Sequence, residues 1–422
     1  MSRLTSAFSP IHNIKHLLSR PSANFSVIDG FRALSMMMIL VFHSFTIYVV
    51  MNPNLELNQV IEEGGYLWSW VWNSDKSVDV FFVISGFLIT GILLRQIDKL
   101  GHVKMGNFYA RRFLRLSPVY YFVIMLYWIL LGQMESSNTE NLWANVLYVN
   151  NFIDYDSQAM NWTWTLAIEE QFYLLFPILL MGLMKHTSNP LRWMWVLFAF
   201  SFFVRWWVMW TDDWIFNTPQ SMLAVDREFH AHHFSVLYDN LYTRFGALLA
   251  GCIAGYYYQY HRSELAAFFS STAGKIFAWG NFGVMMALMI VPMISVRFDD
   301  YATLNVIYQV ASRNVFSIAV SVLIIASLEK GALSTGLNFL LGNRFWYPLA
   351  QLSYSMYLVH VVAISVVCSV VLAEIKANEA LYIHWSTYEV VGVVFAASAF
   401  TTIFVAVIIY LLIERPIMNL RR

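Results

Sequence analysis

The sequence predicts an all-α fold, a polytopic membrane helix bundle with about ten transmembrane helices. Of its 422 residues, 59% are hydrophobic and 12% are charged, whereas about 25% of the residues of a soluble domain are charged. The apolar residues also gather in runs of about 20, the length that crosses a bilayer as a helix. Lipid is therefore the solvent expected for most of the chain.

Ten segments have the length and apolar character of a membrane span. Their ends are expected to shift by about 2–4 residues in the folded protein. An even number of spans places both termini on the same side of the membrane. The segments are 27–50, 77–96, 116–134, 164–184, 191–210, 238–258, 275–295, 304–327, 351–373 and 388–413.

The positions of the basic residues orient this bundle. With a cytoplasmic N-terminus, most Lys and Arg residues fall in cytoplasmic connections, as the positive-inside rule requires. The Lys and Arg residues left in external connections are Lys76, Arg227, Arg297 and Lys376. We therefore predict an integral, multi-pass membrane protein with both termini in the cytoplasm.

Three regions follow from this topology. Residues 1–26 are charged and do not resemble a cleavable signal peptide, so we interpret them as a cytoplasmic N-terminal tail. Residues 27–416 form the transmembrane domain, and 417–422 a cytoplasmic C-terminal tail. No additional soluble module is expected.

The composition also argues against several partners. The chain has 26 basic and 26 acidic residues, so no basic excess points to nucleic acid. Its two cysteines, Cys252 and Cys368, lie in apolar stretches and indicate neither a disulfide framework nor a zinc site. The histidines in Phe229–His233 (FHAHH) form a metal site only if other ligands join them, and solvated side chains are the simpler interpretation. No metal is expected.

Ionisable side chains inside the spans are the main functional candidates. Such groups cost several kcal/mol in lipid unless they face a cavity or one another. Ten of them are too many for accidental exposure to lipid. They are Asp29, Arg32, His43, Asp79, Glu169, Glu170, Arg205, Arg244, Arg313 and His360.

His43 is the predicted centre of the chemistry. Arg32 and His43 are 11 residues apart, which on a helix is nearly the same direction and about 16 Å along the axis, so they line one groove. Asp79, Glu169 and Arg244 lie at the outer ends of their spans, near the level of His43. Histidine suits proton transfer near neutral pH, and a carboxylate can orient it.

We therefore predict His43, Asp79 and Glu169 as catalytic, and Arg244, Glu170 and His360 as binding the acceptor. A structural histidine bonded to a backbone carbonyl is the alternative interpretation of His43 and also of His360.

Six motifs in order along the chain resemble the acyltransferase-3 family of integral membrane acyltransferases. They cover nearly the whole chain, although Thr165 and Ala167 stand where the family usually has small hydroxyl residues. The motifs are Ile28–Leu34 (IDGFRAL) followed by His43, Asp79–Ile89 (DVFFVISGFLI), Phe108–Arg115 (FYARRFLR), Trp164–Tyr173 (WTLAIEEQFY), Leu352–His360 (LSYSMYLVH) and Ile413–Pro416 (IERP).

The resemblance implies that residues 27–416 are an acyltransferase domain using acyl-CoA, usually acetyl-CoA, to O-acylate a carbohydrate or lipid-linked glycan, most often in the bacterial inner membrane. It implies His43 as the catalytic histidine, with Arg32, Arg112 and Arg115 as its functional partners. The residues also fit a CoA donor without the resemblance. The planar guanidinium of Arg binds phosphate through paired hydrogen bonds, and Arg112 and Arg115 are neighbours on a helix face.

Two points stay open from the sequence. His43 acts either as a general base toward the acceptor hydroxyl or as a transient carrier of the acyl group. A transporter or flippase of a carbohydrate or lipid-linked substrate is the alternative function, because intramembrane charges also line substrate pathways. The basic cluster and His43 at opposite ends of one groove favour the enzyme.

Overall fold

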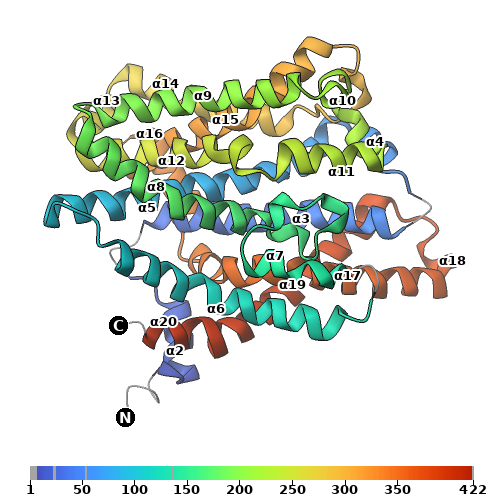
Figure 1. Cartoon of the computed structure of the whole chain (residues 1–422). Helices are drawn as coiled ribbons and strands as arrows, with labels where there is room; N and C mark the ends of the chain where they lie inside the picture. Colours follow the sequence, from blue (N-terminus) through green and yellow to red (C-terminus); the bar gives the residue numbers. More distant parts are fainter. Residues whose placement is uncertain (1–6, 22–24, 53–54, 135–136, 330, 421–422) are drawn as a thin grey trace.

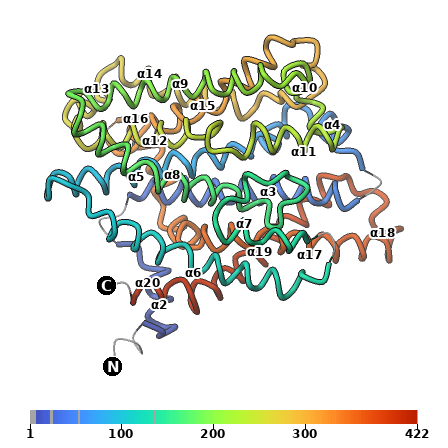
Figure 2. Tube along the Cα trace, in the orientation of Figure 1, coloured from blue at the N-terminus to red at the C-terminus, as the bar shows by residue number. Residues whose placement is uncertain are grey.

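The computed structural model describes residues 7–21, 25–52, 55–134, 137–329 and 331–420. Throughout these ranges the chain is helical and contains no strand, which confirms the all-α prediction. The long helices run side by side along a common axis, and both termini lie at the same end of the bundle (Figures 1 and 2). We call this the inner end, and the end that carries α4, α10 and α18 the outer end.

Each predicted span corresponds to one long helix. Helix α6 differs most from its prediction, because it begins well before the apolar run and includes the basic motif around Arg112. The long helices are α3 (Ser26–Met51), α5 (Ser77–Leu100), α6 (Met105–Leu131), α8 (Trp164–His186), α9 (Pro190–Trp210), α12 (Leu241–Tyr260), α14 (Thr272–Ile290), α15 (Ala302–Leu328), α17 (Trp346–Ala377) and α19 (Thr387–Ile409).

Helix α12 is unusual among these ten. Nine helices in the described part of the chain are long and apolar enough to cross a membrane, and α12 is not one of them. It carries Arg244 and several tyrosines, and it packs against α5, α9 and α15. A helix surrounded by other helices needs no apolar face for lipid. The nine apolar helices establish an integral, multi-pass membrane protein.

Shorter helices fill the connections. The α-helices are α2 (Pro10–Leu18), α4 (Leu57–Trp72), α7 (Leu142–Val146), α10 (Asp213–Asn217), α11 (Arg227–His233), α13 (Arg262–Ser270), α16 (Ala332–Leu341), α18 (Glu379–Tyr382) and α20 (Arg415–Leu420). The 3-10 turns are η1 (Asn73–Lys76), η3 (Thr139–Asn141), η4 (Asn150–Phe152), η5 (Tyr155–Ser157), η6 (Asn161–Thr163), η7 (Gln220–Ala224) and η9 (Val296–Phe298), and the π-turns are η8 (Phe234–Tyr238) and η10 (Tyr410–Glu414).

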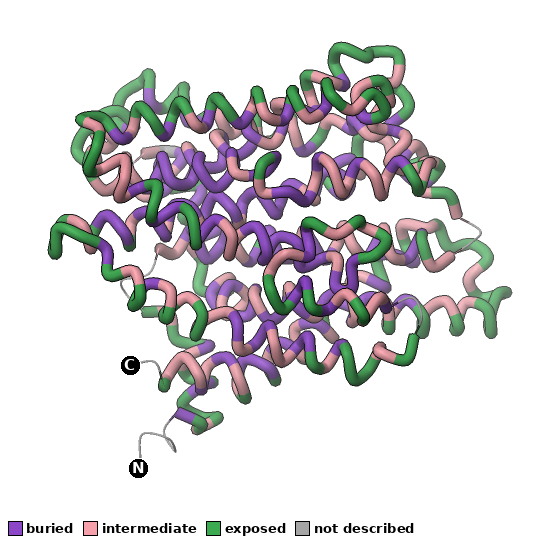
Figure 3. The backbone as a smooth tube through the Cα atoms, viewed as in Figure 1, coloured by how far each residue is buried: buried purple, intermediate pink, exposed green. Residues whose placement is uncertain are grey.

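Glycines bring α5 and α12 into close contact at the centre of the bundle. A β-carbon at Gly86 would clash with the Leu248 carbonyl, and one at Gly251 would clash with the Val83 carbonyl. Small residues at such crossings let membrane helices approach closely. The buried side chains concentrate along the middle of the bundle (Figure 3), so α5 and α12 form a rigid support beside α3.

Candidate active site

The contact between α3 and α17 carries two of the predicted site residues. The Arg32 guanidinium donates a hydrogen bond to Ser353 Oγ at 3.0 Å, and the His43 ring lies against the His360 ring with centroids 4.8 Å apart. Arg32 and His43 therefore face the same neighbouring helix, as the shared groove predicted from their spacing requires. Arg32 lies nearer the inner end and His43 nearer the outer end of α3.

The hydrogen bonds of both histidines indicate which ring nitrogen carries the proton. His43 Nδ1 lies 3.0 Å from the Ile39 carbonyl, and His360 Nδ1 lies 2.6 Å from the Tyr357 carbonyl. A carbonyl only accepts, so each Nδ1 donates and each Nε2 keeps its lone pair. His360 is fully buried and its Nε2 has no partner among the described residues, whereas His43 is only half-buried. His43 thus presents the basic nitrogen that a substrate can reach.

A cluster of arginines lies between the inner end and His43. The Arg112 guanidinium stacks on the Tyr173 ring, 4.0 Å from its centroid. Arg115 interacts electrostatically with Arg112 and Arg32. All three arginines keep partly accessible side chains. The arrangement brings together the three arginines that the resemblance implies as functional partners of His43.

Glu414 is a member of this cluster that was not predicted as a site residue. The π-turn η10 ends at Glu414, whose carboxylate accepts a hydrogen bond of 2.6 Å from Ser355 Oγ. Its charge acts on Arg32 and Arg115. The sequence contained a signal for it, because Glu414 lies in the last of the six family motifs.

The two adjacent acids of α8 lie with the arginines. Glu169 is within hydrogen-bonding reach of Ser85 and Tyr173 and interacts with the Arg112 charge. Glu170 also interacts with Arg112, and its Oε1 is buried without a hydrogen-bond partner among the described residues. Glu169 thus contacts the arginine cluster, although its position in the sequence predicts a place at the level of His43.

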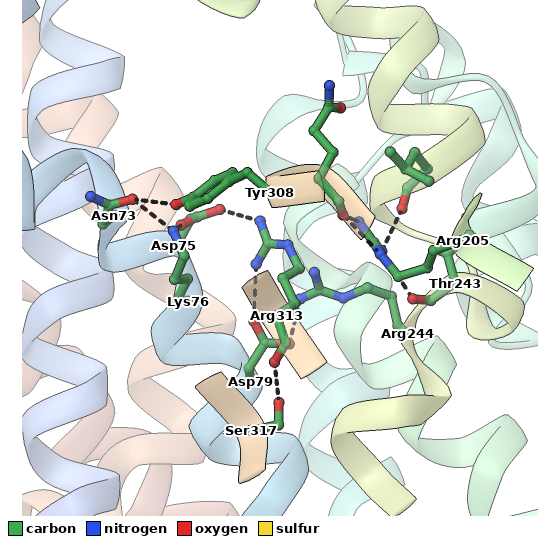
Figure 4. A network of polar contacts seen from close by, with 12 residues as sticks. Asn73, Asp75, Lys76, Asp79, Arg205, Thr243, Arg244, Tyr308, Arg313 and Ser317 are labelled. Carbon is green, nitrogen blue, oxygen red and sulfur yellow. Dashed lines mark hydrogen bonds and ion pairs between the residues drawn. The ribbon is translucent and has the colours of Figure 1, made fainter. Parts of the chain in front are cut away.

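Asp79 and Arg244 belong to a buried ion-pair network (Figure 4). Asp79 lies 3.1 Å from Arg244 and 2.9 Å from Arg313, and Arg313 also pairs with Asp75. Asp79 is 0% exposed and Arg244 is 2% exposed. Arg205, the third arginine of this region, donates to the Gln309 and Thr243 carbonyls. The network joins α5, α12 and α15.

Accessibility divides the predicted residues into two groups. Arg32, His43, Glu169, Arg112 and Arg115 keep partly accessible side chains, although they lie between helices. Asp79, Arg244 and His360 are buried, so protein atoms surround them.

The histidines of α11 are held separately and face different partners. His230 Nδ1 contacts the Leu223 carbonyl, His232 Nε2 lies 2.7 Å from Asp212, and His233 Nε2 lies 3.0 Å from Gln309 Oε1. Among the described residues, no group of three or more His, Cys, Asp or Glu side chains is arranged to hold a metal ion.

Comparison with known proteins connects this site to a family. The model of the acyltransferase-3 family, described as an acyltransferase domain, matches residues 25–411. The chain belongs to the acyltransferase-3 family. Every residue of the arginine cluster except Glu414, together with His43, His360, Asp79 and Arg244, lies within the matched range.

Two curated relatives of this acyltransferase-3 protein are O-acetyltransferases. The peptidoglycan O-acetyltransferase OatA of Listeria monocytogenes is 34% identical over 178 residues, which are 39% of this chain and 25% of the relative. The O-acetyltransferase OatA of Staphylococcus aureus is 32% identical over 177 residues, which are 39% of this chain and 26% of the relative. The chain thus spans about a quarter of the length of these relatives. No solved structure matches it.

Proposed function

We propose that this acyltransferase moves an acetyl group from cytoplasmic acetyl-CoA to a hydroxyl of a carbohydrate or lipid-linked glycan at the outer end of the bundle. One observation carries the proposal. His43 and Arg32 contact the same helix, α17, and Arg32 belongs to a cluster of accessible arginines on the inner side of His43. The names of the relatives support O-acetylation.

The inner cluster suits the charge of CoA. CoA is a polyanion, and guanidinium groups bind phosphate through paired, charge-assisted hydrogen bonds. Arg112 and Arg115 make no hydrogen bond to another described side chain, so their donors are available to a ligand. In this arrangement Arg112 and Arg115 bind the nucleotide end, Arg32 stands at the groove, and the pantetheine arm extends toward His43.

The chemistry follows from the free lone pair of His43. With acetyl-CoA and the acceptor both bound, His43 Nε2 takes the proton of the acceptor hydroxyl as its oxygen attacks the thioester carbonyl. The C–S bond then breaks, and the CoA thiolate receives that proton from His43. Holding both substrates in one chamber needs no covalent intermediate. The proposed location is a bacterial inner membrane, with the inner end and both termini in the cytoplasm.

Labelled acetyl-CoA tests this function. Purified protein in detergent should release CoA and pass label to an added glycan fraction.

The orientation is tested in vesicles with cysteines engineered into each terminus and into the α5–α6 connection. None of these cysteines should react with an external thiol reagent. Uptake of carbohydrate into vesicles without any release of CoA would instead support a transporter and reject the enzyme.

A further inference from the structure

Two π-turns occur in the described residues, and each ends in a polar side chain at one end of the site. Turn η10 ends at Glu414, beside the arginine cluster. Turn η8 ends at Tyr238, beside the ion-pair network. Such π-helical turns are rare in proteins, and those that do occur are often at functional sites. The donor proposal accounts for the inner turn and leaves the outer one without a role.

The ring of Tyr238 is held firmly while its hydroxyl stays free. The Arg313 and Arg244 guanidinium groups lie 4.7 and 5.1 Å from the ring centroid, and Phe234 and Trp164 pack on the ring at 4.8 and 5.0 Å. The hydroxyl makes no hydrogen bond to any residue that the structure describes, and the side chain is partly accessible. An oriented phenol with an open hydroxyl is suited to bind a polar ligand.

Asp75 presents a second free group at the same place. One carboxylate oxygen, Oδ2, pairs with Arg313, whereas the other, Oδ1, has no hydrogen-bond partner in the described part of the chain. The Lys76 ammonium lies 3.9 Å from Oδ1. Figure 4 shows Asp75 and Asp79 on different sides of the Arg313 guanidinium. The sealed ion pairs therefore position the free oxygen of Asp75.

Asp75 lies close to the part of α3 that carries His43. Turn η1, which carries Asp75, packs on α3. The Trp72 ring, three residues before Asp75, contacts the Phe45 ring, two residues after His43, at 5.3 Å. The charge of Asp75 also acts on His43. Asp75 is therefore the carboxylate that the structure brings to the level of His43.

We propose that Tyr238, Asp75 and Arg313 form the acceptor subsite, and that it takes an uncharged carbohydrate ring. This inference rests on the proposed function. The Tyr238 hydroxyl and the Arg313 guanidinium donate to ring or hydroxyl oxygens, and the free oxygen of Asp75 accepts from a neighbouring hydroxyl. Both amino groups of Arg313 already pair with Asp75 and Asp79, and a ligand carboxylate has no proton to donate to the free oxygen of Asp75, so acidic sugars are disfavoured.

The test uses neutral and acidic sugars of matched shape. Release of CoA from acetyl-CoA is measured without sugar and then with the methyl pyranosides of glucose, galactose and mannose, and with methyl glucuronide. The proteins are the wild type, Tyr238→Phe, which keeps the ring between its arginines, and Asp75→Asn, which keeps the shape of the side chain. Tyr242→Phe is the control, because Tyr242 is exposed and its hydroxyl donates to the Val236 carbonyl.

We expect at least one neutral pyranoside to stimulate CoA release by the wild type and by Tyr242→Phe, and methyl glucuronide to stimulate it less. In Tyr238→Phe and Asp75→Asn the KM for that sugar should rise about 10-fold, the effect of one lost hydrogen bond of about 1.4 kcal/mol. Sugar-free CoA release should not change in Tyr242→Phe, and the KM for acetyl-CoA should not change in any of the three variants.

Three results would overturn the subsite. They are no stimulation by any neutral sugar, preference for the glucuronide, or unchanged sugar KM in both variants. An equal loss of sugar-free release and sugar-stimulated release would show a structural role instead and would also reject it. Failure of the wild type to release CoA under any condition would reject the proposed function itself.

Discussion

The His43 and His360 rings meet edge to face, with centroids 4.8 Å apart and planes inclined by 71°. Each ring is anchored through Nδ1 to a carbonyl of its own helix. His360 is the sealed partner, and its Nε2 is buried without a hydrogen bond to a described residue. A buried acceptor left unpaired costs about 1–3 kcal/mol. Stability alone therefore does not explain His360, and we interpret it as a residue that positions His43.

His360→Phe separates these two roles. The variant keeps a ring against His43 and removes the unpaired nitrogen. We expect kcat for acetyl transfer to fall about 10-fold or more, while the melting temperature in detergent and the Kd for acetyl-CoA stay close to those of the wild type. Turnover per folded molecule equal to that of the wild type would show that His360 only fills space.

Arg112 and Arg115 should hold the donor. Replacing either with Ala removes charge-assisted hydrogen bonds of about 1.5–3 kcal/mol, which should raise the Kd for acetyl-CoA about 10- to 100-fold. Lys should restore binding only in part, because it lacks the planar fork. Isothermal titration measures the effect, with Arg111→Ala as the control, since Arg111 is exposed on the same helix. Unchanged affinity in the folded Arg112→Ala, Arg115→Ala double variant would remove both from the site.

The close crossing of α5 and α12 should depend on Gly251. A β-carbon at this position would clash with the Val83 carbonyl, and backbone has little freedom to move away. We expect Gly251→Ala to destabilise the protein by about 1–3 kcal/mol, the usual cost of overpacking. Gly280→Ala on α14 is the control, because no atom lies near its added carbon. Equal melting temperatures for the two variants would contradict the packing described here.

Asp239, in the connection between η8 and α12, should make stability depend on pH. Burial raises the pKa of Asp239 to about 8, and its carboxyl accepts a hydrogen bond of 2.8 Å from Gln158. In an unfolded chain this pKa is about 3.9. The folded state therefore favours the neutral acid, and the stability that it contributes is lost as pH rises from about 4 through about 8.

Asp239→Asn removes this dependence. The melting temperature of the variant relative to the wild type should increase between pH 5 and pH 8. A difference that stays constant over this range would show that Asp239 does not titrate in this way.

The sequence predicted the bundle well because its signal is local. Runs of apolar residues and the asymmetry of Lys and Arg depend on the bilayer and not on which helices touch. The pairing of Arg32 and His43 with α17 was partly accessible to prediction, because both lie on one face of one helix. Asp79 was also predicted to lie at the outer end of its span, and it lies at that end of α5.

The partners of these side chains were not predictable in the same way. Asp79 pairs with Arg244 and Arg313, and Glu169 contacts the donor cluster. These choices depend on the rotation of separate helices, which the sequence of each helix does not specify. Asp75 was missed because it lies in a connection, where a polar residue is not unusual. Tyr238 was missed because a tyrosine at the end of a predicted span is a common interfacial residue. The π-turn that ends at Tyr238 is visible only in the structure.

Single-turnover acetyl transfer by His43→Ala is the most direct test of the account. The protein is loaded with labelled acetyl-CoA, and both donor binding and the label passed to acceptor are measured by rapid quench. Because the proposed function places the donor phosphates on the arginines, donor binding should stay near that of the wild type, while transfer should fall by about 10²–10⁴-fold. No acid-labile label should collect on the wild-type protein when acceptor is absent. Near-normal transfer by well-folded His43→Ala would contradict the central role of His43.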